Sequence, residues 1–292
     1  MRILISGAAG RVGQMVTPVL SEAGYTILGV DRVMPNKRDH MTFRVVDLLN
    51  REICYDLLEN VEAVIHLAAW PSAGRTDDQT LLKDNVSMTV NLLHAAKDLG
   101  IKTFIGASSI QTITRKRPER WNSAPSLPTI PYLPADGNTP ANPSDNYGLS
   151  KQLCEEIMRS YSDWYDMTCV AMRFPSVVSE RWLPRVRRHI HNTGYLCLDE
   201  LFTAITGSDL GRLMDAILKA NLTGYRCYFP TCLKPLSDLP IPELIQTHYP
   251  DIPLRKPLDE MAGLVDISRI TAETGWVPQN EILDMALALE SS

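Results

Sequence analysis

A glycine-rich segment directly after the first apolar run constrains this chain most strongly. Ile3-Leu4-Ile5 is typical of a buried strand, and the loop Gly7-Ala8-Ala9-Gly10-Arg11-Val12-Gly13 follows it. Val16, Val19 and Leu20 then have the spacing of the inner face of a helix. Glycines let a diphosphate approach the backbone, and a helix N-terminus offers free N–H groups and a positive dipole end. The pattern predicts a phosphate-binding turn, although GxxGxxG is not the commonest dinucleotide fingerprint and three glycines also occur in simple tight turns.

The alternation of strands and helices continues along the chain. Apolar runs predict further strands at residues 25–30, 43–46, 63–67, 103–107 and 168–172. Helical spacing covers residues 79–99, which end before Gly100, and residues 147–165. This order predicts an α/β fold, a Rossmann doubly wound parallel sheet with a small C-terminal substrate lobe. Ligands bind beyond the carboxyl ends of such strands, where Asp31, Asp47, His66 and Ser109 lie.

Composition excludes several classes of partner. The 292 residues carry a net charge of −5, which gives no electrostatic footprint for nucleic acid. No apolar run approaches the length of a membrane span, and the glycine loop interrupts the N-terminal apolar run, so we expect no membrane partner, no signal peptide and a cytoplasmic protein. None of the six cysteines forms a CxxC pair and no histidine has zinc-finger spacing, so we expect neither a metal site nor a disulfide framework.

A proline-rich stretch interrupts the regular pattern. Residues 114–146 contain seven prolines and no apolar periodicity, and a long irregular loop inside a compact domain is usually functional or mobile. We expect this stretch to be a lid over the substrate, inserted in an NAD-binding domain at residues 1–175. Residues 176–292 are expected to form mainly the substrate-binding lobe, partly interleaved with the first domain.

Asp31 predicts the cofactor. It stands 18 residues beyond Gly13, at the end of the second predicted strand. That offset is close to the ~20 residues at which an acidic side chain binds the ribose hydroxyls of NAD. A carboxylate would repel the 2′-phosphate of NADP, so NAD is favoured. Arg32 leaves NADP open, because an arginine can accommodate that phosphate, and Asp31 could also be an ordinary acid at a strand end.

Tyr147 and Lys151 provide a second chemical element. In Tyr147-Gly148-Leu149-Ser150-Lys151 the two residues are four positions apart, so on a helix they share a face. An ammonium beside a phenol lowers the pKa of the phenol, since nearby positive charge favours the phenolate. A tyrosine tuned in this way can act as a general base near neutral pH. Many helices carry this spacing by chance, but this helix comes after a strand that ends at a serine.

These segments together carry a family resemblance. GAAGRVG, Asp47-Leu48, His66-Leu67-Ala68-Ala69, Asp84-Asn85-Val86, Ser108-Ser109 and YGLSK resemble the extended short-chain dehydrogenase/reductases of the NAD-dependent epimerase/dehydratase family. Ser208-Asp209-Leu210, Val265-Asp266-Ile267-Ser268-Arg269 and Thr274-Gly275-Trp276-Val277-Pro278 extend the resemblance over almost the whole chain. No single motif is specific, but their combination is.

The resemblance implies residue roles. Tyr147 would be the catalytic acid/base, Lys151 would lower its pKa, and Ser109, or its neighbour Ser108, would bind the reacting oxygen. Asn85 would support this catalytic site. NAD would be bound by Gly7, Ala9, Gly10, Arg11, Val12, Gly13, Asp31, Arg32, Asp47, Leu48, Leu67, Ala68, Ala69, Asn85, Ala107, Tyr147, Lys151 and Pro175. The substrate would contact Trp70, Ser109, Ile110, Gln111 and Arg185.

Departures from the family pattern restrict the reaction. Sugar dehydratases carry Asp-Glu where Ile110-Gln111 follow Ser109, so dehydration is not expected. The chain is as compact as uronate dehydrogenases, in which an arginine beyond the sixth strand binds the substrate carboxylate. Arg185 is one of four arginines available here, and a bidentate pair would suit an acidic sugar. The same arginines could instead form a solvated basic face.

The sequence therefore predicts an NAD-dependent oxidoreductase that acts on a secondary hydroxyl of a sugar or sugar acid. An NAD-dependent sugar epimerase with transient oxidation is the first alternative. A non-catalytic dinucleotide sensor is the second, disfavoured because Tyr147 and Lys151 are both present. The expected partner is the small-molecule substrate, and a homodimer is one option.

Overall fold

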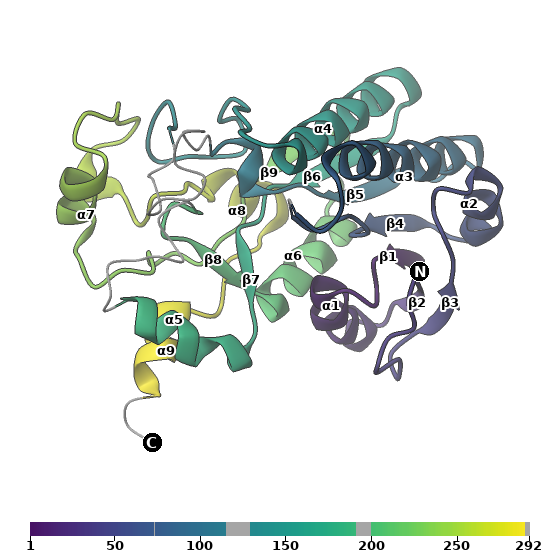
Figure 1. The fold of residues 1–292 in the computed structure, drawn as a ribbon, viewed down its shortest axis with the longest axis horizontal. Coiled ribbons are helices and arrows are strands. Elements are labelled where there is room, and N and C mark those ends of the chain that lie inside the picture. Colours follow the sequence, from purple (N-terminus) through teal and green to yellow (C-terminus); the bar gives the residue numbers. More distant parts are fainter. Residues whose placement is uncertain (73, 115–128, 191–199, 290–292) are drawn as a thin grey trace.

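A single parallel sheet organises the molecule (Figure 1). The computed structural model describes residues 1–72, 74–114, 129–190 and 200–289. Within them, seven strands run in the order β3-β2-β1-β4-β5-β6-β9. Their bounds are β1 Arg2–Ser6, β2 Thr26–Asp31, β3 Thr42–Val45, β4 Ala63–His66, β5 Thr103–Ala107, β6 Thr168–Met172 and β9 Tyr225–Tyr228. The strand order reverses between β1 and β4, which creates a crevice at their carboxyl ends. The predicted doubly wound fold is confirmed.

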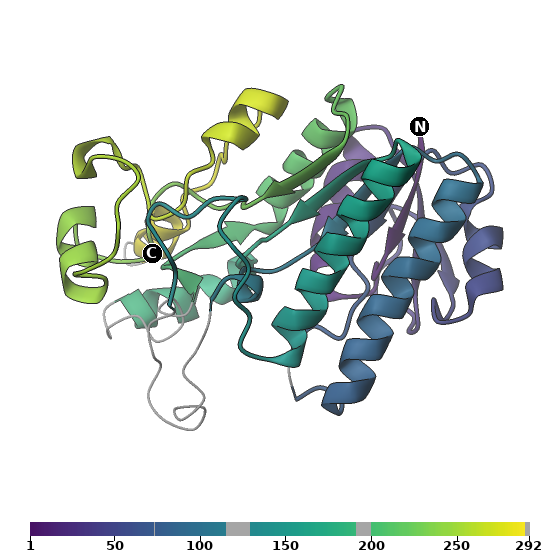
Figure 2. The same ribbon diagram turned by 90° about the horizontal axis from the view of Figure 1, so that it is seen from above.

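Helices cover both faces of the sheet because the apolar side chains of each buried strand alternate between them. Ile3 and Ile5 of β1 belong to one core cluster, and Leu4 between them belongs to the other. Figure 2 shows α3 and α4 side by side on one face, where α2 also packs, while α1 and α6 cover the opposite face. The bounds are α1 Arg11–Glu22, α2 Arg51–Leu58, α3 Asp78–Asp98, α4 Asn146–Tyr165 and α6 Gly207–Lys219.

Helices α1 and α6 pack closely because α6 has glycines at the contact. Gly207 and Gly211 lie one turn apart on α6, and they face Met15 and Val19 of α1. A Cβ added at Gly211 would lie 2.8 Å from the Cβ of Val19, so a larger residue there would push the helices apart. A segment from beyond residue 200 therefore completes the packing around the first helix of the chain.

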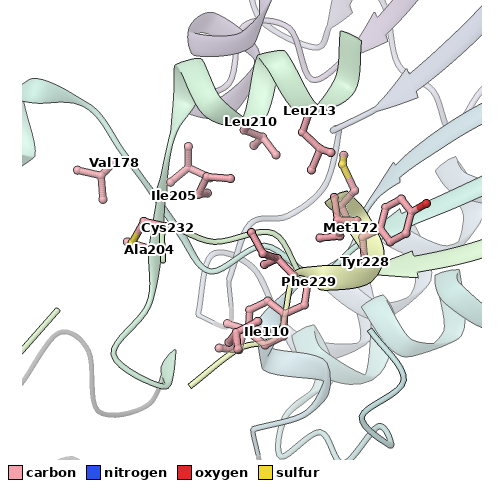
Figure 3. Packing of buried hydrophobic residues seen from close by; sticks show 14 of the residues in the cluster. Ile110, Met172, Val178, Ala204, Ile205, Leu210, Leu213, Tyr228, Phe229 and Cys232 are labelled. Atoms are coloured by element: carbon pink, nitrogen blue, oxygen red, sulfur yellow. The ribbon is translucent and has the colours of Figure 1, made fainter. Parts of the chain in front are cut away.

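The C-terminal half also forms a smaller region beside the sheet. Its elements are β7 Ser176–Val178, α5 Leu183–Ile190, β8 Ala204–Thr206, α7 Ile241–His248, α8 Ser268–Thr274 and α9 Ile282–Ala288. Strands β7 and β8 pair in parallel to form a separate two-stranded sheet. Figure 3 shows the buried side chains where this region meets the main sheet, including Met172 and Tyr228 on one side and Val178 and Ile205 on the other. The two regions share one continuous hydrophobic cluster.

The second half of the proline-rich stretch packs against the C-terminal region. Residues 115–128, which form much of the expected lid, lie outside the described residues. Further along, the N–H groups of Leu133 and Ala135 donate to the carbonyls of Pro253 and Leu264, both at 2.9 Å. Leu133 and Ala135 are fully buried. The absence of apolar periodicity hid this attachment, because it uses isolated bridges rather than a strand. The division into domains and the lid stay predictions.

None of the helices in the described ranges is both long enough and apolar enough to cross a membrane.

Candidate active site

A cavity of about 760 Å³ opens at the carboxyl ends of the sheet strands. Its size is in the range of small-molecule and cofactor sites. One end is lined by the glycine loop and the residues that follow β2, and the other by Ser109, Tyr147, Lys151 and the segment 174–177. The predicted cofactor and catalytic segments, which are far apart in the sequence, therefore meet in one place.

The glycine loop has backbone geometry that other residues would disturb. Gly7 has a φ of +72°, and a Cβ added there would lie 2.6 Å from the backbone nitrogen of Ala68. A Cβ at Gly13 would lie 2.4 Å from the carbonyl oxygen of Gly7. Gly10 is the N-cap of α1 and has no side chain to bond the first-turn N–H groups, which leaves them available to an anion. This cradle fits a dinucleotide diphosphate.

Asp31 and Arg32 line the other side of the same end of the cavity. The carboxylate of Asp31 accepts hydrogen bonds from the N–H groups of Ala9 at 3.1 Å and Arg32 at 2.7 Å. The guanidinium of Arg32 lies 4.4 Å from the ring centroid of Trp70, whose indole N–H donates to Asp84 at 2.9 Å. The backbone thus fixes the Asp31 carboxylate at the end of β2, where it could accept from ribose hydroxyls, while Arg32 stacks on an aromatic ring.

Tyr147 and Lys151 project into the cavity from the first turns of α4. Asp145 begins this helix as its N-cap, and its carboxylate accepts from the N–H of Gly148 at 2.7 Å. The Nζ of Lys151 donates to the carbonyl of Ala107 at 2.9 Å and lies 5.8 Å from the centroid of the Tyr147 ring. Ser109 lines the cavity beside Tyr147, close enough to lower the pKa of its phenol. The structure therefore brings the three predicted catalytic side chains together.

The surroundings of Tyr147 shift the pKa of its phenol upward. Burial raises this pKa to about 12, Ser109 opposes the shift, and the negative charges of Glu200 and Asp145 add to it. Burial also lowers the pKa of Lys151, whose ammonium is directed to a backbone carbonyl. Burial is the largest cause of the shift at Tyr147, because desolvation penalises the phenolate. The lowering of the Tyr147 pKa by Lys151 stays a prediction.

Ser108 and Ser109 have different surroundings. The hydroxyl of Ser108 donates to the carboxylate of Glu155, which also pairs with Arg173. Both serines line the cavity, but the hydroxyl of Ser109 accepts from the N–H of Gln111 at 3.1 Å and is not engaged by Glu155. Of the two serines that the sequence left open, Ser109 has the position that could bind a reacting oxygen.

Several predicted residues do not line the cavity. Asn85 is buried and bonds the backbone N–H of Trp70 at 2.8 Å and the hydroxyl of Ser150 at 3.0 Å, so it acts on the loop after β4. Ile110 lies in the hydrophobic core. Arg185 is exposed on α5, with its guanidinium 5.3 Å from the centroid of Trp182. Ala9, Asp47 and Trp70 are likewise outside the lining, whereas the remaining predicted cofactor residues belong to it.

The structure adds lining residues that sequence reasoning missed. Glu200 and Trp182 come from the C-terminal half, Arg75 from the loop after β4, and Asp145 from the start of α4. Asp145 could have been found as an N-cap three residues before Gly148. Glu200 and Trp182 carry no local motif, and only the fold places them beside Tyr147.

Comparison with known proteins decides the family. The profile of the NAD dependent epimerase/dehydratase family matches residues 3–206. The chain belongs to this family. NAD is the cofactor of the family, as the sequence predicted, and an enzyme of the extended short-chain dehydrogenase/reductase type is confirmed at the family level.

The relatives that match this chain carry the names of different enzymes. It is 30% identical over 181 residues to an NAD-dependent glucose-6-phosphate dehydrogenase of Haloferax volcanii, covering 59% of this chain and 66% of the relative. It is 28% identical over 202 residues to a uronate dehydrogenase of Pseudomonas syringae, covering 68% and 66%. The chain thus spans just under two thirds of the length of these curated relatives. A UDP-glucose 4-epimerase of Thermotoga maritima, solved with UDP-glucose, shares the fold with a TM-score of 0.71, 18% identity and coverage of 99% and 98%.

Proposed function

We propose that this protein is an NAD-dependent oxidoreductase that oxidises a secondary hydroxyl of a sugar or sugar acid. The observation that carries the proposal is the meeting of Ser109, Tyr147 and Lys151 in the cavity that also contains the glycine loop. The family supports the cofactor, and the names of the relatives support a sugar as substrate.

The residues of the site have separate tasks in this proposal. The glycine loop holds the diphosphate and Asp31 binds the adenosine ribose. Ser109 donates a hydrogen bond to the reacting oxygen, Tyr147 takes the hydroxyl proton, and Lys151 places a positive charge beside the phenol. Bound NAD supplies the acceptor for the hydride that leaves the same carbon. The products are a ketone or lactone, a reduced cofactor and one proton.

A sugar epimerase is the second candidate, and the similarity to a UDP-glucose 4-epimerase fold favours it. It would use the same side chains, but the oxidised sugar would stay bound and be reduced on its other face. A sensor without catalysis is disfavoured, since Ser109, Tyr147 and Lys151 are arranged together rather than dispersed.

A substrate panel with two tyrosine variants tests the proposal. Free sugars, sugar phosphates, uronic acids and nucleotide sugars are offered with NAD, and both NADH and product isomers are measured. NADH formation supports a dehydrogenase, and isomers without net NADH support an epimerase. Tyr147→Phe should lower the rate by ~10²–10⁴-fold, since proton transfer contributes about that much. Tyr165→Phe, at an exposed position on the same helix, is the matched control. Turnover that survives in Tyr147→Phe contradicts the assigned role of Tyr147, and no turnover with any sugar contradicts the function.

A further inference from the structure

Arg32 and Trp70 are in contact at the end of the cavity where Asp31 lies. Arg32 follows Asp31 after β2 and lines the cavity, while Trp70 belongs to the loop after β4. The Cζ atom of the Arg32 guanidinium lies 4.4 Å from the centroid of the indole ring. A guanidinium at this distance from an aromatic ring is attracted to it by a cation–π interaction. The contact therefore joins the two loops that follow the strands on either side of β1.

Helix α3 holds Trp70 through three hydrogen bonds. The indole N–H donates to the carboxylate of Asp84 at 2.9 Å, and the backbone N–H donates to the side-chain oxygen of Asn85 at 2.8 Å. The amide of Asn85 also donates to the carbonyl of Trp70 at 3.3 Å. Asp84 and Asn85 are both buried, so the partners of Trp70 are themselves fixed. Arg32, in contrast, is exposed, and the fixed indole ring determines where its guanidinium rests.

The stacked guanidinium of Arg32 keeps its hydrogen-bond donors uncommitted. Among the residues that the structure describes, no carboxylate pairs with it. The neighbouring carboxylate of Asp31 accepts from the backbone N–H of Arg32 instead, at 2.7 Å. A guanidinium presents five donors in a fork that matches a phosphate, and an arginine near the ribose-binding acid can accommodate the 2′-phosphate of NADP. Arg32 thus has the chemistry to bind NADP, but its guanidinium lies on Trp70.

We propose that Trp70 is a positioning residue for cofactor specificity. By holding the guanidinium of Arg32 on its indole ring, it keeps this group from pairing with a 2′-phosphate and leaves Asp31 to select NAD. Trp70 does not line the cavity, so it acts through Arg32 and not by touching the cofactor. The inference rests on the ribose-binding role that the proposed function gives to Asp31, and it adds a second determinant from a distant segment of the chain.

Cofactor binding by variants of Trp70 tests this role without any turnover. Calorimetric titrations give the dissociation constants of NAD and NADP for wild type, Trp70→Ala and Trp70→Phe. Trp70→Ala should bind NADP about two- to fivefold more tightly, which is the strength of an exposed cation–π contact expressed as a ratio of constants, and should bind NAD as wild type does. Trp70→Phe keeps an aromatic ring and should lie between the two. Trp164→Ala removes an indole that is 68% exposed on α4, and it should change neither constant.

A second substitution determines whether Arg32 carries the effect. Adding Arg32→Ala to Trp70→Ala should abolish the gain in NADP affinity, whereas adding Arg75→Ala, at another arginine of the cavity lining, should preserve it. The same series in an Asp31→Ala background removes the repulsion of the 2′-phosphate, so that NADP binding is strong enough to measure. Adenosine 2′,5′-bisphosphate and AMP, used as competing ligands, restrict the readout to the adenosine end, and the ratio of their affinities should follow that of NADP and NAD.

The possible outcomes distinguish this inference from the function it rests on. NADP affinity that is unchanged or lower in Trp70→Ala would overturn the role of Trp70, since the stack would then not withhold Arg32 from the phosphate. Equal changes for NAD and NADP would overturn it as well, because they indicate a structural effect on the loop after β4. A gain that survives Arg32→Ala would assign the effect to another group. The proposed function fails separately, if wild type binds no NAD or converts no sugar.

Discussion

The guanidinium of Arg173 donates two hydrogen bonds, at 2.8 and 2.6 Å, to the carboxylate of Glu155, directly behind the serine pair that follows β5. Both side chains are almost completely buried. Glu155 also accepts from the hydroxyl of Ser108, the neighbour of Ser109. This ion pair joins α4 to the end of β6 and fixes the segment from which the site serine extends.

Glu155→Gln should destabilise the protein strongly. Breaking a buried pair leaves Arg173 without its counter-charge, at a cost of about 3–5 kcal/mol. Urea unfolding followed by circular dichroism measures the change. Asp166→Asn is the control, because Asp166 pairs with Lys102 at the surface, with 99% of its side chain exposed, and its φ of +51° suits asparagine. Equal stability of the two variants would show that the buried pair contributes little.

Gly7→Ala should lose both stability and NAD affinity. The residue would adopt a left-handed φ and its Cβ would meet the backbone of Ala68, which no side-chain rotation can relieve. Gly24→Ala is matched to it, since Gly24 also has a positive φ but nothing lies within 4 Å of an added Cβ. Both variants pay roughly 1–2 kcal/mol for the conformation. Only Gly7→Ala should also weaken NAD in a binding titration. Equal NAD affinity in the two variants would contradict the close approach at Gly7.

Asp31→Ala should reduce the preference for NAD over NADP by about tenfold or more, because it removes a charged acceptor for the ribose hydroxyls. Dissociation constants for both cofactors provide the measurement. Arg32→Ala is the companion variant and should change the preference less, as Arg32 stacks on Trp70. A wild-type protein that binds NADP more tightly would assign cofactor choice to Arg32 instead.

His66 should make the protein sensitive to mild acid. Burial lowers its pKa from 6.5 to about 3, and the charge of Lys151 adds to this shift. Between these two values the unfolded chain binds a proton that the folded protein does not. The free energy of unfolding should therefore fall as the pH drops below about 6.5, by up to about 1.4 kcal/mol per pH unit from this group.

His66→Asn removes this titration while an amide takes the place of the ring near Ser6 and Thr89, which lie 2.7 and 3.1 Å from the ring nitrogens. Urea unfolding at pH 7, 6 and 5 should give a steeper loss for wild type than for the variant. Parallel curves would mean that the pKa of His66 is not lowered in the folded protein.

The sequence predicted the first six strands of the main sheet to within one or two residues. Their short apolar runs end in polar residues, and caps such as Gly100 end the helices between them, so local pattern and tertiary structure agree. The same agreement identified Tyr147 and Lys151, because a spacing of four residues on a helix already places both on one face.

Other parts depend on contacts between distant segments, which no local pattern encodes. The last strand, Tyr225–Tyr228, has four residues, and its pairing with Cys169–Met172 places it in the sheet. Glu200 enters the cavity only because β7 and β8 pair beside the main sheet. Asn85 and Arg185 had the right chemistry for the site, but the orientation of their helices directs them to Trp70 and to Trp182.

Two elements from the C-terminal half pack on the main sheet and its first helix, and this limits where the chain could be separated into independent domains. Helix α6 covers α1, and β9 pairs with β6, although both come from beyond residue 200. A fragment that ended at residue 175 would have a bare β6 edge, and α1 would lose the helix that packs on Met15 and Val19. The first 175 residues are therefore not expected to fold as an independent unit, either in evolution or in a designed fusion. Recombination that changed the C-terminal half would have to keep α6 and β9.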